Sequence, residues 1–195
     1  WFRNTWCWSG SRDTPTLGVG NDGAIAAQHP ELGSRYLYAD GGPSLLFCDN
    51  ETNARRLYGV DGAAGYFKDG FHEYIVAGRS GAVNPARTGT KAAAYYRVEI
   101  PAGEQVSVRF RLHAAGAGAE APRDPLGREF DAIFAARIRE ADEFYAAHIP
   151  GAATDEERRV ARQGYAGLLM SKQFYYYIVK QWLEGDPAQP SAPAG

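Results

Sequence analysis

Residues 96–112 read YRVEIPAGEQVSVRFRL, two alternating segments joined by a short break. Every second residue of both segments is apolar or aromatic, and these residues are Tyr96, Val98, Ile100, Val106, Val108, Phe110 and Leu112. Strict alternation of this kind is typical of strands that bury one face. The Pro-Ala-Gly-Glu sequence between the two segments favours a turn. The stretch therefore predicts a β-hairpin with its apolar face buried.

Shorter apolar or aromatic runs, bounded by Gly, Asp, Asn or Pro, indicate further strands at residues 25–28, 36–38, 45–48 and 74–77. Several short strands at such spacing favour an antiparallel β-sandwich, which we place at residues 1–115. The glycines of residues 18–23 resemble a phosphate-binding motif, but no helix pattern follows them. We therefore expect turn glycines there.

The hydrophobic period changes after a Gly/Ala/Pro linker at residues 116–127. Apolar residues then recur at spacings of three and four, which predicts an amphipathic helix over residues 128–148. Thr154 and Glu157 have the spacing of a capping box, in which each side chain bonds a free backbone N–H at a helix start. The sequence thus predicts two helices within residues 128–184, the second running from 155 to about 184, and then a Pro/Ala linker at 185–195.

The apolar residues of the second helix extend beyond one narrow stripe. They are Val160, Leu168, Leu169, Phe174, Tyr175, Ile178, Val179 and Trp182. A helix that is apolar on more than one side must be covered on more than one side. We therefore expect a neighbouring domain on the C-terminal side, missing from these 195 residues.

Composition excludes some classes of partner. The formal net charge is -2 and no block of Lys or Arg stands out, which argues against nucleic acid. No apolar run approaches the roughly 18 residues of a membrane span, and we expect a cytoplasmic protein. The chain begins at Trp1 rather than Met, so secretion stays open. Cys7 and Cys48 could pair, but two buried free thiols are favoured.

Polar clusters follow the strand-like runs and contain four candidate carboxylates for acid–base chemistry, Asp49, Glu51, Asp69 and Glu73. Turn polarity explains them better, because Asp and Asn side chains bond their own backbone at turns. The four histidines are scattered, so we expect no metal site and no cofactor. The aromatic cluster within residues 1–8 suits either a sugar-stacking platform or packing, and packing is favoured.

Seven polar residues on these loops are expected to lie on one side of the sandwich and to face the missing domain. They are Asn50, Glu51, Asn53, Lys68, Asp69, His72 and Lys91. Amides, carboxylates, a histidine and lysines suit either sugar hydroxyls or an interdomain hydrogen-bond network. The other interpretation is that each residue caps a turn by bonding its own backbone.

Six segments occur in order along the chain, at residues 1–6, 46–53, 68–72, 84–94, 140–145 and 171–187. Together they resemble the large bacterial proteins related to glycoside hydrolase family 63, which includes mannosyl-oligosaccharide glucosidases and proteins similar to mannosylglycerate hydrolase. The resemblance implies an N-terminal β-sandwich, two linker helices and then an (α/α) toroid that carries out catalysis.

The same resemblance implies that the catalytic acid and base lie beyond residue 195, so no catalytic residue is assigned to this chain. It implies a parent enzyme that hydrolyses α-linked glucose or a related sugar with inversion, using carboxylates roughly 6.5–9.5 Å apart. We expect the chain alone to be inactive. Its expected partners are the helical catalytic domain of the same polypeptide and an oligosaccharide. The alternative function is a stand-alone carbohydrate-binding or scaffolding module.

Overall fold

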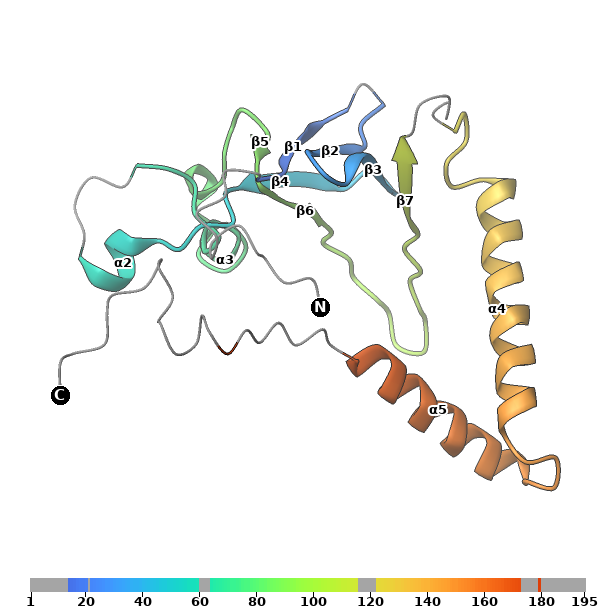
Figure 1. The fold of residues 1–195 in the computed structure, drawn as a ribbon. Helices are drawn as coiled ribbons and strands as arrows, with labels where there is room; N and C mark the ends of the chain where they lie inside the picture. The colour runs from blue at the N-terminus through green and yellow to red at the C-terminus, as the bar shows by residue number, and fades with distance from the viewer. Residues whose placement is uncertain (1–13, 21, 60–63, 116–121, 173–178, 180–195) are drawn as a thin grey trace, which may run out of the picture. The chain divides into compact units, whose positions relative to one another are not determined.

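The computed structural model describes residues 14–20, 22–59, 64–115, 122–172 and 179. The chain divides into two compact units, one within Asp13–Phe130 and one that includes the residues from Asp131 onward. Each unit is described by itself. The first contains the strands and short helices, and the second contains most of the two long helices (Figure 1).

The first unit is built from two antiparallel sheets. The larger has the strand order β5-β1-β2-β3-β7, and the smaller pairs β4 with β6. Their bounds are β1 Thr16–Val19, β2 Ile25–His29, β3 Gly33–Ala39, β4 Ser44–Cys48, β5 Thr88–Gly89, β6 Lys91–Tyr95 and β7 Phe110–Ala115. Antiparallel sheets were expected from the sequence, and the strands predicted at residues 25–28, 36–38 and 45–48 lie within β2, β3 and β4.

The core of this unit gathers around β4. Phe47 and Cys48 are fully buried, and Leu46 and Ile25 are 5% and 3% exposed. β4 is apolar over four successive positions, which suits a strand covered on both faces. Gly20 and Gly23 close the turn between β1 and β2, through hydrogen bonds from Gly20 N to the Ala24 carbonyl and from Gly23 N to the Gly20 carbonyl. Turn glycines were expected there.

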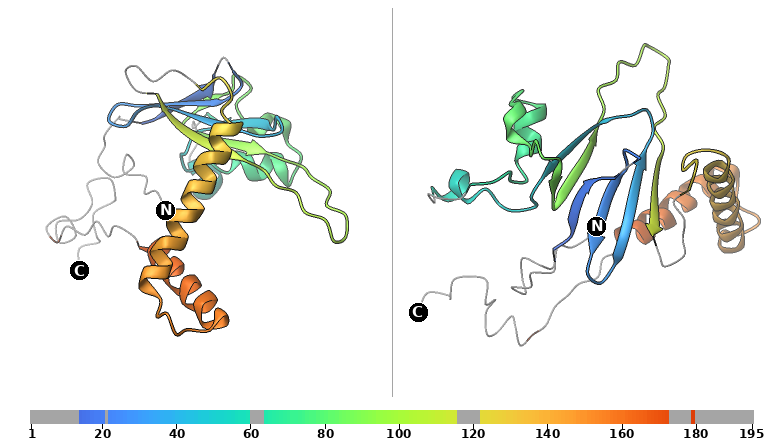
Figure 2. Two further views of the ribbon diagram at one scale, coloured as in Figure 1. Left: turned by 90° about the vertical axis from the view of Figure 1, so that its right-hand side faces the viewer. Right: turned by 90° about the horizontal axis from the view of Figure 1, so that it is seen from above.

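The predicted hairpin at residues 96–112 is only partly right. Its turn is present, with Glu104 N donating to the Pro101 carbonyl at 3.1 Å and Gly103 at φ 80°. Residues 96–109, however, form no strand. The reason is that β6 pairs with β4 while β7 pairs with β3, so the two flanks belong to different sheets. The connecting arm projects beyond both sheets (Figure 2).

The predicted burial of the alternating face is also wrong. Leu112 is 69% exposed, and Val98, Ile100 and Val106 are about half exposed. The Arg111 side chain is only 15% exposed, and it contacts the Pro125 carbonyl and Glu129. Because side chains alternate between the faces of a strand, burying Arg111 turns Phe110 and Leu112 outward.

Residues 74–77 form no strand: Tyr74 and Ile75 end a helix, and residues 76 and 77 form a turn. This helix is α3, Gly70–Ile75, whose end is closed by a bond from Val76 N to the His72 carbonyl. A four-residue apolar run does not distinguish a strand from a helix. Two further short helices lie nearby in this unit, α2 at Ala54–Tyr58 and the 3₁₀ helix η1 at Ser80–Ala82.

The two long helices appear where the sequence places them. α4 spans Arg128–His148, and α5 spans Asp155–Ser171 behind a complete capping box. Glu157 N donates to Thr154 Oγ1 at 3.3 Å, and Thr154 N donates to Glu157 Oε2 at 2.8 Å. α5 ends earlier than the predicted residue 184, because Lys172 is extended. Residues 173–178 and 180–184 lie outside the described residues.

α4 and α5 contact each other through a few residues. Arg162 on α5 pairs with Asp142 at 2.6 Å and lies over the Tyr145 ring at 4.7 Å. Tyr145 and Tyr165 also meet, with ring centroids 6.4 Å apart. None of the described residues within the two helices is buried, including those that make these contacts.

Candidate functional site

Three loops meet where β4 ends and β6 begins. Asp49 N donates to the Tyr66 carbonyl at 2.6 Å, and Lys68 N donates to the Glu51 carbonyl at 3.2 Å. Asn50 N donates to Thr90 Oγ1 at 2.8 Å. These bonds join the loop after β4 both to the loop before α3 and to the start of β6. Segments distant in the sequence are thereby held together.

Two glycines let neighbouring elements approach closely, β5 to β4 and α3 to η1. A Cβ on Gly89 would lie 2.4 Å from the Cys48 carbonyl oxygen, and a Cβ on Gly70 would lie 2.3 Å from the Ala82 carbonyl oxygen. Contacts under 3.0 Å are essentially never seen for a real Cβ. The approach of α3 to η1 therefore requires glycine at position 70, and the site is built on closely packed backbone.

An amide and ion-pair network connects α2, α3 and the segment before η1. Asn53 caps α2 by accepting from Arg56 N at 3.1 Å, and its Nδ2 donates to Asp69 Oδ2 at 3.0 Å. Arg56 Nη1 contacts Asp69 Oδ2 at 3.1 Å and Glu73 Oε1 at 2.8 Å. Arg79 Nη1 contacts Glu73 Oε2 at 2.8 Å. We call these five residues the Asn53–Arg79 network.

The network balances its own charge, because two carboxylates face two guanidinium groups. Its carboxylates are the more buried members: the side chains of Asp69 and Glu73 are 26% and 17% exposed, against 51% and 72% for Arg56 and Arg79. The hydrogen bond to Asp69, together with the charge of Glu73, raises the pKa of Arg56 above its ordinary value. Arg56 therefore remains a charged partner of both carboxylates at any pH near neutrality.

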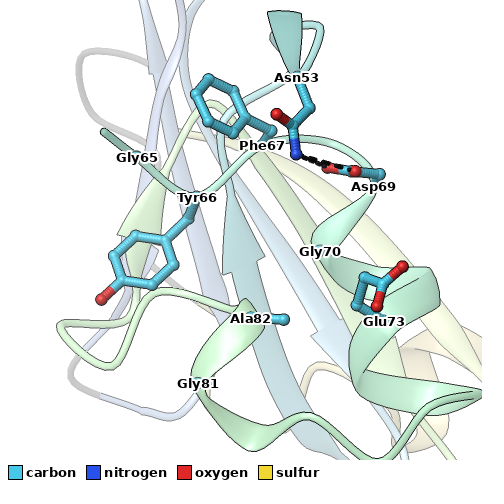
Figure 3. A pocket seen from close by; sticks show the side chains of 9 residues that line it. All are labelled: Asn53, Gly65, Tyr66, Phe67, Asp69, Gly70, Glu73, Gly81 and Ala82. Carbon is cyan, nitrogen blue, oxygen red and sulfur yellow. Dashed lines mark hydrogen bonds between the residues drawn. The ribbon is translucent and has the colours of Figure 1, made fainter. Parts of the chain in front are cut away.

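A cavity of about 170 Å³ lies beside this network. It is lined by Asn53, Gly65, Tyr66, Phe67, Asp69, Gly70, Glu73, Gly81 and Ala82. In the view of Figure 3, Tyr66 and Phe67 lie to the left of the cavity, and Asp69 and Glu73 lie to the right. The cavity thus combines aromatic rings with hydrogen-bond acceptors.

The structure brings most of the seven residues expected from the sequence to this end of the first unit. Asn53 and Asp69 line the cavity. Asn50, Glu51 and Lys68 contribute backbone bonds to the meeting loops. Lys91 Nζ lies over the Phe71 ring at 5.7 Å. His72 is exposed on α3. Of the seven, only Asn53 and Asp69 therefore reach the cavity.

Sequence analysis missed the residues that complete the site. Arg56, Arg79 and the rings of Tyr66 and Phe67 were not among the expected site residues, and Glu73 was considered only as an acid. The spacing of Asn53 and Arg56 carries a local signal, since an Asn three residues before a helical N–H is a typical cap. Arg79 gave no such signal, because only the chain reversal after α3 brings it to Glu73.

Metal ligands, thiols and apolar helices were examined in the part of the chain that the structure describes. No group of three His, Cys, Asp or Glu residues there could hold a metal ion. Cys48 is a free, buried thiol, and burial raises its pKa to about 11. Cys7 lies outside the described residues. None of the described helices is both long enough and apolar enough to cross a membrane.

Comparison with known proteins finds a similar protein in yeast. The chain is 35% identical, over an alignment of 222 residues, to the uncharacterized protein YMR196W of Saccharomyces cerevisiae. The alignment covers 95% of this chain and 20% of the yeast protein, so the chain spans about a fifth of its relative. No family model matches the chain, and no solved structure matches it.

Proposed function

We propose that this chain is the non-catalytic β part, with two linker helices, of a glycoside hydrolase related to family 63. In this proposal the β part is a sandwich, and an (α/α) toroid elsewhere in the polypeptide cleaves α-linked glucose or a related sugar with inversion. The six ordered segments that resemble that family support it. The match covers 20% of the yeast relative, and the rest of that protein is long enough to contain such a domain. The proposed location is the cytoplasm, and the bacterial origin expected from the sequence belongs to the same proposal.

The observation that carries the accessory role is the pairing of the candidate acids. Both Asp69 Oδ2 and Glu73 Oε1 contact the same Arg56 Nη1 atom, at 3.1 and 2.8 Å. These two oxygens therefore lie no more than about 6 Å apart, short of the roughly 6.5–9.5 Å between the two carboxyls of an inverting glycosidase. The network suits a scaffold better than an acid–base pair.

The exposed apolar residues of α4 and α5 also support a covering domain. Ile133 and Ile138 on α4 are 45% and 49% exposed, and Leu168 and Met170 on α5 are 72% and 82% exposed. Apolar patches of more than a few hundred Å² usually mark interaction sites. A helical domain packed on these helices would bury them, as the resemblance implies.

The test compares the purified 195-residue chain with the full-length yeast relative. Both are incubated with an aryl α-glucoside and with α-linked glucose disaccharides, and NMR follows the anomer released first. We expect the full-length protein to release β-glucose and the chain alone to release none. Turnover by the chain alone, or a full-length protein inactive on every α-glucoside and related sugar tested, would contradict the proposal.

The second candidate is a stand-alone carbohydrate-binding or scaffolding module. The cavity beside the Asn53–Arg79 network favours it, because aromatic rings and acceptors suit a sugar. The two candidates differ in the measurement above. A binding module gives sugar binding by the chain and no hydrolysis by any longer form.

A further inference from the structure

We propose that the cavity beside the Asn53–Arg79 network binds one neutral pyranose ring. The inference rests on the proposed function and deepens it, by placing a sugar subsite on the β part rather than in the catalytic domain. Its chemistry follows from three properties of the site: charge, remaining hydrogen-bond capacity and shape.

Charge selects a neutral ligand. Asp69 and Glu73 would attract a cation if they were unpaired, but Arg56 bridges them and Arg79 holds the second oxygen of Glu73. Two positive and two negative groups leave no net charge to attract an ion. An anion would meet the two carboxylates, the more buried members of the network. A ligand with hydroxyl groups and no charge fits this balance.

The carboxylates keep acceptor capacity for such hydroxyls. An ionised carboxylate offers about four lone-pair sites. Glu73 accepts one bond from Arg56 and one from Arg79. Among the described residues, Asp69 Oδ1 accepts a single contact, the long one of 3.3 Å from Asn53. Hydroxyl donors on a ligand could therefore bond both residues without breaking an ion pair, and bonds to charged acceptors are the stronger kind.

Shape selects a single ring with an apolar face. The cavity volume of about 170 Å³ lies below the roughly 300–1,000 Å³ of pockets for drug-sized ligands. Tyr66 and Phe67 lie across from Asp69 and Glu73 (Figure 3). One face of a pyranose presents C–H groups that pack on aromatic rings, while its edge presents hydroxyls. The two sides of the cavity offer both kinds of contact.

Backbone packing and hydrogen bonds order the cavity-lining residues before a ligand binds. Gly70 fits against the Ala82 carbonyl so closely that no side chain could stand there, and both residues line the cavity. Asn53 is fixed by its two roles, as the cap of α2 and as a donor to Asp69. Ordering these groups in advance lowers the entropy cost of binding a small ligand.

The test is isothermal titration calorimetry of the 195-residue chain with methyl α-D-glucopyranoside, and with maltose to probe a second ring. The key variant is Gly81→Leu, which adds a side chain at a cavity residue where a Cβ meets nothing within 4 Å. Gly151→Leu is the matched control, because its Cβ is equally unobstructed and it lies between α4 and α5. We expect millimolar binding by the wild type and by Gly151→Leu, and binding at least tenfold weaker by Gly81→Leu.

A second pair of variants tests the contact between the sugar and the aromatic residues that line the cavity, Tyr66 and Phe67. Tyr66→Ala should weaken binding several-fold, whereas Tyr58→Ala, an exposed tyrosine on α2, should leave it unchanged. Far-UV circular dichroism checks that every variant folds.

Absence of binding by the wild type, or equal binding by Gly81→Leu and Gly151→Leu, overturns the sugar site. Those results leave the proposed function standing, because hydrolysis by the full-length relative is measured separately. Conversely, an inactive full-length relative with sugar binding by the chain overturns the glycosidase and keeps the site.

Discussion

Gly70→Ala tests the claim that α3 and η1 touch through bare backbone. The added methyl would lie 2.3 Å from the Ala82 carbonyl oxygen and 3.3 Å from its carbon. This oxygen belongs to the backbone and has no rotamer to adopt. One of the two segments must therefore move, and the cavity between them must change shape.

Two effects of opposite sign can be compared. Replacing Gly by Ala in a helix gains about 1 kcal/mol of helix propensity. Overpacking a closely packed site costs about 1–3 kcal/mol, occasionally more, and the contact here is with rigid backbone. Because rigid backbone cannot yield, we expect a cost near the upper end, about 3 kcal/mol, and therefore a net loss of about 2 kcal/mol in the free energy of unfolding. For a small domain this lowers the urea midpoint by about 1 M.

The measurement is urea denaturation followed by far-UV circular dichroism. Gly18→Ala in β1 is the matched control, because its Cβ would lie 3.7 Å from Thr88 Cγ2, an ordinary contact. That variant should stay within about 0.5 kcal/mol of the wild type. If Gly70→Ala unfolds at the same urea concentration as Gly18→Ala, the close contact between α3 and η1 is not part of the native protein.

Two further predictions concern α5 and the core. Thr154→Ala should cost about 1 kcal/mol of stability by removing the cap of α5. The Thr154 bonds hold the pKa of Glu157 below its ordinary value, so the stability that Glu157 contributes is present at neutral pH and is lost as the pH falls through its folded-state pKa. A pH series of urea denaturations should show Glu157→Gln less stable at neutral pH but closer to the wild type in acid; parallel curves would refute this. Cys48 should not react with a thiol reagent until the protein unfolds, because its thiol is fully buried with a pKa of about 11; a Cys7→Ser background isolates it, and fast labelling of the native protein would contradict its burial.

Local patterns were the reliable part of the sequence analysis. The capping box at Thr154 and the three-and-four spacing before His148 each specify a helix through neighbours in the chain, and both helices begin where expected. β4 was also predicted, although its short apolar run is a weaker signal than these two helix patterns. Such signals need no knowledge of distant contacts.

Residues 96–112 failed as a prediction because their environment is set by distant partners. Alternation identifies two faces of a strand but not which face is buried. Here Glu129 and the Pro125 carbonyl bind the Arg111 side chain and keep it on the buried face. Nothing in the sequence of residues 96–112 predicts these two partners. The turn was predictable, whereas the pairing of β6 with β4 and of β7 with β3 was not.

The candidate site likewise has a part that was predictable from local sequence and a part that depends on distant contacts. Residue type indicated that Asn53 and Asp69 belong to a polar cluster, and their loops do meet. The arginines that neutralise the carboxylates come from α2 and from the segment after α3, so the charge balance could be seen only in three dimensions. The sequence favoured turn polarity over acid–base chemistry for these carboxylates, and the charge balance adds that the cluster as a whole is neutral.

The separation of β6 from β7 by an unpaired arm has a consequence for the order of folding. β1, β2 and β3 form a meander whose neighbouring strands are joined by short turns. β7 must find β3 across roughly seventy residues, so its loop-closure entropy is higher. Since contacts between distant residues form more slowly than local ones, we expect β7 to join a preformed meander late. Until then the exposed edge of β3 can pair with a strand of another chain. The rate at which the arm brings β7 to β3 therefore determines how long this risk of aggregation lasts.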